Sequence, residues 1–468
     1  MSDQVKFGTS GLRGLTSALL GPVARRHVTA FLSHLTAQGE RPERVYLGRD
    51  LRASSPALLG DCAAALHAAG IEAVDCGALP TPALALYAMA AGCPAIMVTG
   101  SHIPADRNGL KFYTRLGEIS KADEAGIIAA LRPEATEVIS PPLRSEAALA
   151  GNFYRQRYRF LMPTDLLVGW RIGVFEQSGV ARDMLVSLFT RAGAEVVRIG
   201  RSETFIPVDT EAFSDPIYAP CHAAIRAQRL DAIVSTDGDG DRPLLLLADG
   251  QFVRGDALGL LAAQFVGADC VVTPVTSNSG IEAQGGFATV IRTRVGSPFV
   301  IAAMAESPGR VVVGFEANGG TLLGSPVRVG QVHLSALPTR DAILPLIAAF
   351  SLAARAGLSL AALVDRLELP AARSDRLADV PPERGQAFLE RLVASWGTSS
   401  LSALAGGSDM NLTTLDGPRV RFANGEILHY RGSGNAPELR CYVEAATEAR
   451  AEVLLDEGLA IARRAIFA

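Results

Sequence analysis

The chain has 468 residues, enough for three or four domains of ordinary size. Hydrophobic residues make up 49% of the chain and charged residues 20%, a balance typical of a globular protein with several buried cores. The formal net charge is −4 with both signs spread along the chain, which gives no global support for nucleic-acid binding. Any bound anion must therefore be held by a local cluster of Arg or Lys.

The N-terminal stretch "MSDQVKFGTSGLRG" has no apolar region of the kind found in secretory signals. The longest apolar stretch, residues 343–364, contains Pro345 and Arg355, which favours buried helices over a membrane span. The six cysteines are scattered singly, without a CxxC pair. We therefore expect a cytoplasmic protein with reduced core thiols, no zinc site, and no nucleic-acid or membrane partner.

Three segments share one layout, in which short β-rich runs alternate with helical runs. They begin with residues 44–50, 171–177 and 269–276. In each segment a late strand run ends in an unusual loop: "TGSHIPADRNG", "DGDGDR" or "FEANGG". This alternation predicts α/β units with mixed or parallel sheets. Because α/β sheets usually place ligands at loops beyond strand ends, the three loops would suit one shared cleft.

The region after these segments differs, because its strand runs are punctuated by "DG" and "NG", both typical of β-hairpins. A helical run then closes the chain. The sequence therefore predicts three similar α/β domains and a small C-terminal α+β domain. We place their limits at residues 1–150, 151–254, 255–370 and 371–468.

The loop "STDGDGDRP" places Asp237, Asp239 and Asp241 at alternate positions. In an extended loop alternate side chains point the same way, so the three carboxylates would converge. Such a cluster is unfavourable without a cation, and hard oxygen ligands suit Mg²⁺. A solvated acidic turn is the plainer alternative. A calcium EF-hand is rejected, because the positions that need Gly and Glu hold Arg242 and Ala248.

Three further loops carry groups suited to phosphate or sugar. Ser101, in "TGSHIPADRNG", could be a nucleophile or a turn residue that hydrogen-bonds its own backbone. The loop "YRGSGNAPELR" combines small residues with arginine, which suits a phosphate but is also common in ordinary turns. The loop "GFEANGG" offers a carboxylate and an amide for sugar hydroxyls, or forms a plain strand-to-loop corner.

These motifs together resemble the α-D-phosphohexomutase superfamily, which includes the bacterial phosphomannomutases and phosphoglucomutases. The resemblance runs from "FGTSGLRG" at residues 7–14 to the end of the chain. It follows the family order of N-terminal motif, phosphoserine loop, metal loop, sugar loop and C-terminal phosphate loop. It implies four domains around a central cleft, of which the first three share a topology.

The resemblance also implies a role for each motif residue. Ser101 would carry the transferred phosphoryl group, and its phosphate would complete the coordination of Mg²⁺ by the three aspartates, Asp237, Asp239 and Asp241. The remaining residues match catalytic or substrate-binding positions: His102 and Lys111 for proton transfer, Arg13 and Arg242 near the phosphoserine, Glu316 and Asn318 for the sugar, and Arg431, Ser433, Gly434 and Asn435 for the distal phosphate.

Several loops depart from the commonest family patterns. The serine loop has "TGSHIP" in place of "TASHNP", and the C-terminal loop has "RGSGNAP" in place of "RPSGTEP". In the sugar loop, "FEANGG" replaces "GExSGH", so Asn318 stands where Ser is usual. Ser297, in "TRVGS", is expected to touch sugar hydroxyls and stands where some relatives have His. These variants are typical of the phosphomannomutase subgroup and leave the sugar preference open.

The implied function is interconversion of hexose 1-phosphate and hexose 6-phosphate through a phosphoserine enzyme and a 1,6-bisphosphate intermediate. We expect a phosphomannomutase, or an enzyme with both phosphomannomutase and phosphoglucomutase activity. Its cofactor would be Mg²⁺ and its primer hexose 1,6-bisphosphate. Phosphoglucosamine mutase is the nearest alternative. A metal-dependent sugar phosphatase would not need the distal phosphate loop, and a sugar-phosphate sensor would have a damaged serine or metal loop. We expect a monomer or homodimer that binds a small hexose phosphate.

Overall fold

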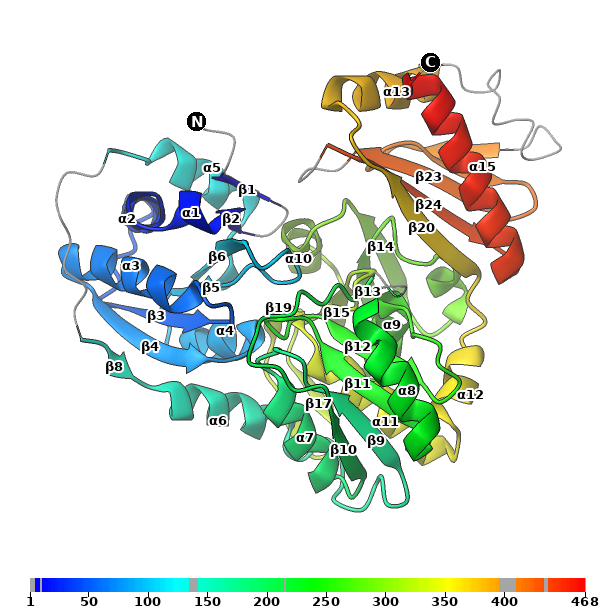
Figure 1. Cartoon of the computed structure of the whole chain (residues 1–468), viewed down its shortest axis with the longest axis horizontal. Coiled ribbons are helices and arrows are strands. Elements are labelled where there is room, and N and C mark those ends of the chain that lie inside the picture. The colour runs from blue at the N-terminus through cyan, green and yellow to red at the C-terminus, as the bar shows by residue number, and fades with distance from the viewer. Residues whose placement is uncertain are drawn as a thin grey trace.

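The computed structural model describes residues 5–8, 11–133, 142–211, 213, 216–394, 410–432 and 437–467. Four large sheets with helices packed against them make up this part of the chain (Figure 1). Their strands come from residues 5–145, 171–247, 270–341 and 371–445. Each sheet therefore lies within one of the four segments predicted as domains.

The first sheet has the strand order β1-β2-β6-β5-β3-β4-β8, with β7 paired to β6. Helices α2, α3 and α5 cover one face over one hydrophobic cluster, and α4 and α6 cover the other face over a second cluster. The strands are β1 (Val5–Phe7), β2 (Leu12–Leu15), β3 (Arg44–Arg49), β4 (Glu72–Ala78), β5 (Ala95–Val98), β6 (Arg107–Thr114), β7 (Gly117–Glu118) and β8 (Arg144–Ser145). The helices are α1 (Thr16–Leu19), α2 (Pro22–Ala37), α3 (Ser55–Ala68), α4 (Thr81–Ala90), α5 (Lys121–Ala129) and α6 (Ala147–Tyr158).

The second sheet has the order β10-β9-β11-β12 and the third has the order β14-β13-β15-β16-β19. The second unit contains β9 (Arg171–Phe175), α7 (Arg182–Arg191), β10 (Glu195–Ile199), η1 (Pro216–Tyr218), α8 (Ala219–Gln228), β11 (Ala232–Thr236) and β12 (Pro243–Leu247). The third contains α9 (Gly255–Val266), β13 (Cys270–Pro274), η2 (Ser279–Gln284), β14 (Thr289–Thr293), α10 (Ser297–Ala305), β15 (Val312–Phe315), β16 (Thr321–Leu323), β17 (Val327–Val329), β18 (Val332–Leu334), β19 (Leu337–Asp341), α11 (Ile343–Ala356) and α12 (Leu360–Asp365).

One topology recurs in the first three sheets, which confirms the repeat. The orders β4-β3-β5-β6, β10-β9-β11-β12 and β14-β13-β15-β16 each place three parallel strands beside a fourth, antiparallel strand. The three unusual loops join the third of these strands to the fourth, at residues 99–106, 237–242 and 316–320. They therefore hold the same topological position in their units.

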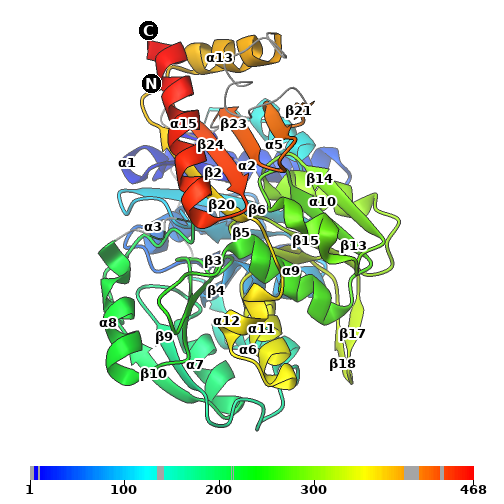
Figure 2. The same ribbon diagram turned by 90° about the vertical axis from the view of Figure 1, so that its right-hand side faces the viewer.

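The fourth sheet is entirely antiparallel, in the order β20-β24-β23-β22-β21, and α15 lies along it (Figure 2). It has a hydrophobic cluster of its own, whereas the largest cluster runs through the first three sheets. Its elements are β20 (Ala371–Leu377), α13 (Pro382–Ala394), β21 (Met410–Thr413), β22 (Arg419–Phe422), β23 (Ile427–Gly432), β24 (Leu439–Ala445) and α15 (Glu448–Phe467).

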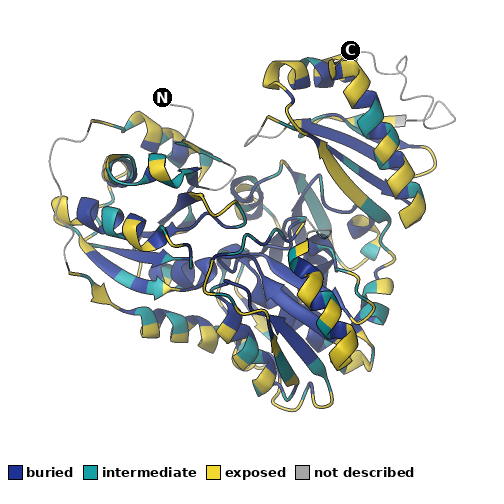
Figure 3. Cartoon of the chain, viewed as in Figure 1, coloured by how far each residue is buried: buried dark blue, intermediate teal, exposed yellow. Residues whose placement is uncertain are grey.

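Burial follows the residue pattern of each element. Central strands such as β9, β11 and β13 are buried along almost their whole length, because helices cover both of their faces (Figure 3). The apolar stretch 343–364 forms the helices α11 and α12, as predicted. No helix in the described part of the chain combines the length and apolar character needed to span a bilayer. All six cysteines are free thiols, and five are buried.

Candidate active site

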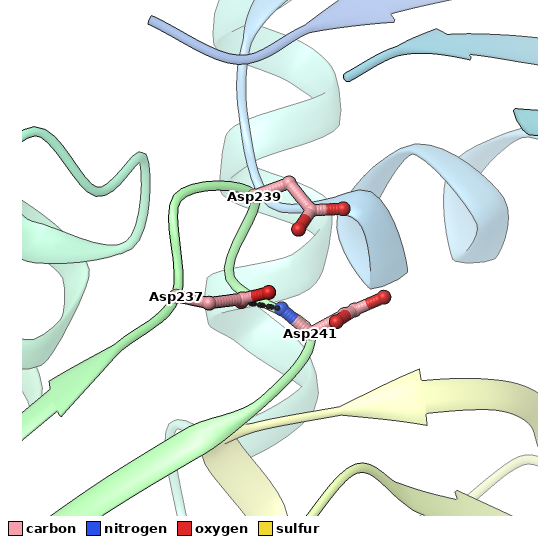
Figure 4. A group of neighbouring side chains, drawn as sticks. All are labelled: Asp237, Asp239 and Asp241. Atoms are coloured by element: carbon pink, nitrogen blue, oxygen red, sulfur yellow. Dashed lines mark hydrogen bonds between the residues drawn. The ribbon is translucent and has the colours of Figure 1, made fainter. Parts of the chain in front are cut away.

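The connection between β11 and β12 gathers the three aspartates of the acidic loop. Asp237, Asp239 and Asp241 are each at most 1% exposed. One carboxylate oxygen from each lies within 4.8 Å of the others (Figure 4). Asp237 Oδ1 accepts hydrogen bonds from the backbone N–H groups of Asp241 and Arg242, each at 3.2 Å, which curls the loop around this carboxylate. The predicted convergence of the three carboxylates is confirmed.

Two oxygens of this cluster are suited to a cation. Asp239 Oδ1 and Asp241 Oδ1 are buried and have no hydrogen-bond partner among the described residues. A buried carboxylate oxygen without a donor costs free energy. Because divalent cations such as Mg²⁺ prefer carboxylate oxygens, the three aspartates fit a metal site.

Ser101 lies in the connection between β5 and β6 and reaches the acidic loop of the second sheet. Its Oγ donates a hydrogen bond to Asp237 Oδ2 at 2.6 Å, and the residue is fully buried. Its N–H donates to Thr99 Oγ1 at 2.8 Å. Its φ is +54°, in the left-handed region that costs a non-glycine residue about 1 kcal/mol. A strained serine that touches buried carboxylates is more typical of a functional site than of a plain turn.

Lys111, in β6, lies opposite Met97 of β5 and supplies a positive charge to the cluster. Its Nζ donates to Asp239 Oδ2 and to Asp241 Oδ2, each at 2.6 Å. Burial alone would lower the pKa of Lys111, but the two carboxylates outweigh burial and raise it. Burial and the other two carboxylates raise the pKa of Asp237 well above its usual value. The ammonium group therefore neutralises only part of the acidic loop.

His102 and two arginines flank the serine. His102 Nδ1 lies 3.3 Å from Ser101 Oγ. Burial, followed by the positive charges of Arg242 and Arg13, holds the pKa of His102 well below its usual value. Burial and the charges of Arg242 and Arg340 lower the pKa of Arg13 to about 10. A neutral imidazole thus stands beside the hydroxyl within a group of arginines.

Arg340, which the sequence patterns did not single out, joins the third unusual loop to the acidic loop. It lies in β19 and is 2% exposed. Its Nε donates to Asp241 Oδ2 at 3.2 Å, and its Nη1 donates to Glu316 Oε2 at 3.0 Å. The sequence signal was an Arg–Asp pair, at the end of a short strand, that comes just before the long apolar helix α11. A buried arginine at such a place needs carboxylate partners.

Two of the predicted sugar-binding residues have partners of their own. Asn318 Oδ1 accepts a hydrogen bond from the N–H of Gly320 at 3.0 Å. Ser297 begins α10, is fully buried, and donates to Glu118 Oε1 of the first sheet at 2.8 Å. No hydrogen bond among the described residues joins either side chain to the acidic loop. Their contact with a sugar stays a prediction.

Arg431 lies in β23, where the fourth sheet meets the third unit. Its Nε donates to Asp416 Oδ2 at 2.9 Å. The same oxygen accepts a hydrogen bond from the N–H of Val295 at 3.0 Å. Asp416 therefore holds Arg431 beside the third unit. The other predicted residues of the C-terminal loop, Ser433, Gly434 and Asn435, lie outside the described residues.

Two family models match the chain. They describe the phosphoglucomutase/phosphomannomutase alpha/beta/alpha domain I, over residues 4–137, and domain III, over residues 254–369. A phosphomannomutase of Sinorhizobium fredii is 48% identical, over 97% of this chain and 98% of its own length. One of Salmonella muenchen is 42% identical, over 95% of this chain and 92% of its own. The chain belongs to the phosphoglucomutase/phosphomannomutase family.

The family also accounts for the fold. A phosphoglucomutase/phosphomannomutase family protein of Burkholderia thailandensis has a TM-score of 0.75 at 23% identity, covering 98% of this chain and 97% of its own. A phosphoglucosamine mutase of Salinispora arenicola is a more distant relative, 30% identical over 71% of this chain and 76% of its own length. The predicted resemblance to the α-D-phosphohexomutases and the predicted multi-domain α/β architecture are confirmed.

Proposed function

We propose that this family member is a phosphohexomutase that interconverts hexose 1-phosphate and hexose 6-phosphate, with mannose phosphate as its main substrate. The observation that carries the proposal is the 2.6 Å hydrogen bond from Ser101 Oγ to Asp237 Oδ2, which joins a hydroxyl to a buried cluster of carboxylates. The two relatives that match almost the whole chain are phosphomannomutases, which supports mannose as the sugar. The family name supports glucose phosphate as a second substrate.

In the proposed reaction, Ser101 carries a phosphoryl group in the resting enzyme. The bond between Ser101 Oγ and phosphorus breaks as the free hydroxyl of the hexose phosphate bonds to phosphorus. The proton of that hydroxyl passes to a base, and Ser101 Oγ takes up a proton as it leaves. The hexose 1,6-bisphosphate then presents its other phosphoryl group and returns it to Ser101. Added hexose 1,6-bisphosphate would therefore prime an enzyme that has lost its phosphoryl group.

Charge stabilisation would come from both sides of the transferred group, because phosphoryl transfer depends mainly on positioning and electrostatics. Asp237, Asp239 and Asp241, with a phosphate oxygen on Ser101, would hold Mg²⁺, which supplies positive charge at the phosphoryl oxygens. The unpartnered oxygens of the acidic loop support this assignment. The neighbouring arginines, Arg13 and Arg242, would bind the remaining phosphoryl oxygens.

The two candidates for proton transfer differ in charge. His102 has a lowered pKa, so it is neutral near pH 7 and suited to accept a proton from the sugar hydroxyl. Lys111 has a raised pKa, so it is suited to donate a proton or to stabilise negative charge. Sites that shift the pKa values of two neighbouring groups in opposite directions are typical of acid–base pairs.

Substrate recognition would use the third and fourth units. Glu316, Asn318 and Ser297 would bind sugar hydroxyls, and the distal phosphate would bind Arg431 with Ser433, Gly434 and Asn435. The ion pairs of Glu316 with Arg340 and of Arg431 with Asp416 show that both charged groups are already held in place. Preorganised groups of this kind lose less entropy on binding.

The decisive experiment is steady-state kinetics of the purified protein with Mg²⁺ and catalytic hexose 1,6-bisphosphate. We expect kcat/KM to be highest for mannose 1-phosphate, lower for glucose 1-phosphate and lowest for glucosamine 1-phosphate. The reverse order would favour a phosphoglucosamine mutase. Free phosphate without isomerised sugar phosphate would show a phosphatase, and binding without turnover a sensor. Sedimentation would test the predicted monomer or homodimer.

A further inference from the structure

Beneath the loop that carries Ser101 lies a buried arginine, Arg52, to which the proposed reaction gives no role. It is 1% exposed. Its Nη1 donates to the carbonyl oxygens of Pro104 and Arg107, at 2.6 and 2.9 Å. Its Nη2 donates to those of Ser101 and Ile103, at 2.9 and 2.5 Å. One guanidinium group therefore satisfies four carbonyl groups of the loop.

Asp50 fixes Arg52 from the opposite side. Its Oδ2 accepts hydrogen bonds from Arg52 Nε at 3.2 Å and from Thr99 Oγ1 at 2.8 Å. Thr99 Oγ1 in turn accepts the N–H of Ser101 at 2.8 Å. The pair of Asp50 and Arg52 thus holds both backbone polar groups of Ser101, the residue with a left-handed φ. A planar guanidinium is needed for this, because an ammonium group has no fixed fork of donors.

Phe205, from the second unit, packs against both this arginine and the acidic loop. The guanidinium carbon of Arg52 lies 3.9 Å from the centroid of the Phe205 ring. The edge of the same ring packs against the acidic loop, because a Cβ added to Gly238 would lie 2.8 Å from Phe205 Cε2 and 3.0 Å from Phe205 Cζ. The same Cβ would lie 3.2 Å from the carbonyl oxygen of Ser101. The ring therefore packs beside the place where the two loops meet, in contact with Arg52 and with Gly238.

The segment that carries Phe205 is fixed to the second unit without help from Arg52. The N–H of Ile206 donates to Ser178 Oγ at 2.8 Å. Arg182 Nη1 donates to the carbonyl oxygen of Ser202 at 2.8 Å. Phe205 is thus held by hydrogen bonds within the second unit, which carries the acidic loop. Arg52 is held by hydrogen bonds within the first unit, which carries the serine loop.

We propose that Arg52 and Phe205 act as a spacer that sets the position of Ser101 relative to Asp237. Both are positioning residues, because neither touches the reacting atoms. The inference rests on the proposed mutase function, in which the phosphoryl group on Ser101 must be aligned with the acidic loop and its cation. A misplacement of about 1 Å can cost phosphoryl or acyl transfer about 10²-fold in rate.

The test uses the full-length variants Arg52→Lys and Phe205→Leu. We expect kcat to fall about tenfold or more in each, with KM for the hexose phosphate within about twofold of wild type, because positioning affects transfer more than binding. We also expect faster hydrogen–deuterium exchange in residues 99–107 of both variants. Phe205→Leu does not change any residue of the segment 99–107. Faster exchange of that segment in this variant must therefore be transmitted from the second unit to the first. The control is Arg355→Lys, far from the serine loop. Arg355 lies in α11, and its guanidinium carbon is 5.5 Å from the ring of Phe265 in α9.

The two readouts separate failure of the spacer from failure of the proposed function. A wild-type protein that interconverts no hexose phosphate would overturn the proposed function, and hydrogen exchange would still test the spacer. Unchanged exchange of residues 99–107 in Phe205→Leu would overturn the spacer. The spacer would also be overturned if, in an active enzyme, a variant had a lowered thermal midpoint but an unchanged kcat. If Arg52→Lys does not fold, Phe205→Leu carries the test, since Leu keeps an apolar side chain beside the loops.

Discussion

Ser101 and Asp237 are 136 residues apart in the chain, and Ser101 Oγ donates a 2.6 Å hydrogen bond to Asp237 Oδ2. The two residues hold the same topological position in consecutive repeated units, because each lies between the third and fourth strands of the repeated four-strand pattern. The reacting centre is therefore built where two copies of one topology face each other. Changes at this contact should separate chemistry from folding.

Replacing Ser101 with alanine should remove mutase activity while the protein still folds. Without Oγ no phosphoseryl group can form, so we expect kcat to fall at least about a thousandfold. The measurement is the primed mutase assay, with circular dichroism as the check on folding. Ser351→Ala is the control, since Ser351 is a fully buried serine in α11. Activity near the wild-type level in Ser101→Ala would contradict the nucleophile.

Removal of divalent cations should abolish activity, because two buried carboxylate oxygens of the acidic loop accept no hydrogen bond from the described residues. We expect EDTA to stop turnover and added Mg²⁺ to raise the thermal midpoint of the wild-type protein. Asp239→Asn should need about tenfold more Mg²⁺ for half-maximal activity. Asp249→Asn, which removes an exposed carboxylate just after β12, should not change the Mg²⁺ requirement. An Asp239→Asn enzyme with the wild-type Mg²⁺ requirement would count against the metal site.

The bridge formed by Arg340 should affect both stability and activity. Arg340→Met leaves Glu316 and Asp241 buried without this partner, so we expect a loss of about 3 kcal/mol or more in the free energy of unfolding. Adding Glu316→Gln should recover part of that stability, because it removes one of the two buried charges that lose Arg340, while Asp241 keeps Lys111. The double variant should still lose about a hundredfold or more in kcat/KM. Recovery of activity together with stability would show that the bridge is only structural.

The fourth unit should lose stability in mild acid through His429. Burial above all lowers the pKa of this imidazole to about 4, from an ordinary value of 6.5. Between those values the unfolded chain binds a proton that the folded chain does not, so the free energy of unfolding falls as the pH drops. From about pH 7 to pH 5 the loss should reach about 2 kcal/mol. Urea denaturation of wild type and His429→Gln checks this.

The glutamine variant keeps a donor for the carbonyl oxygen of Asp416, which lies 2.8 Å from His429 Nε2, and removes the titrating group. We therefore expect its stability to depend less on pH in this window. The same pH dependence in wild type and variant would assign the effect to other groups.

Local patterns predicted the parts of the site that depend on neighbouring residues. The alternation of Asp and Gly predicted that Asp237, Asp239 and Asp241 converge, on the assumption of an extended loop. They do converge, but through a turn that curls around Asp237, which the glycines allow. The repeated units were predicted as well, since hydrophobic runs of strand and helix length recur in order. The antiparallel direction of the fourth strand in each unit was not predicted. The direction in which a strand pairs depends on the path of the chain before it, which local patterns do not show.

Contacts between units were beyond the sequence patterns. The shared cleft was expected from loops beyond strand ends, but the specific meeting of Ser101 with Asp237 came from the family resemblance. Arg340 and Phe205 were not predicted at all. Each gains its importance from two loops that approach it from different sheets. The Arg–Asp pair before α11 marks Arg340 only as a charge near an apolar helix, and nothing in the sequence around Phe205 names the loops it contacts.

The separate hydrophobic cluster of the fourth sheet has a consequence for the reaction cycle. The cluster shared by the first three sheets includes Tyr46, Val174 and Phe350, so one continuous interior supports the loops of Ser101, Asp237 and Glu316. Arg431 belongs to a sheet packed on its own interior. In the proposed reaction the far phosphate could therefore be released and bound again while the contact of Ser101 with Asp237 keeps its geometry. Both proposed phosphoryl transfers would then take place at one unchanged centre, and only the sugar would turn.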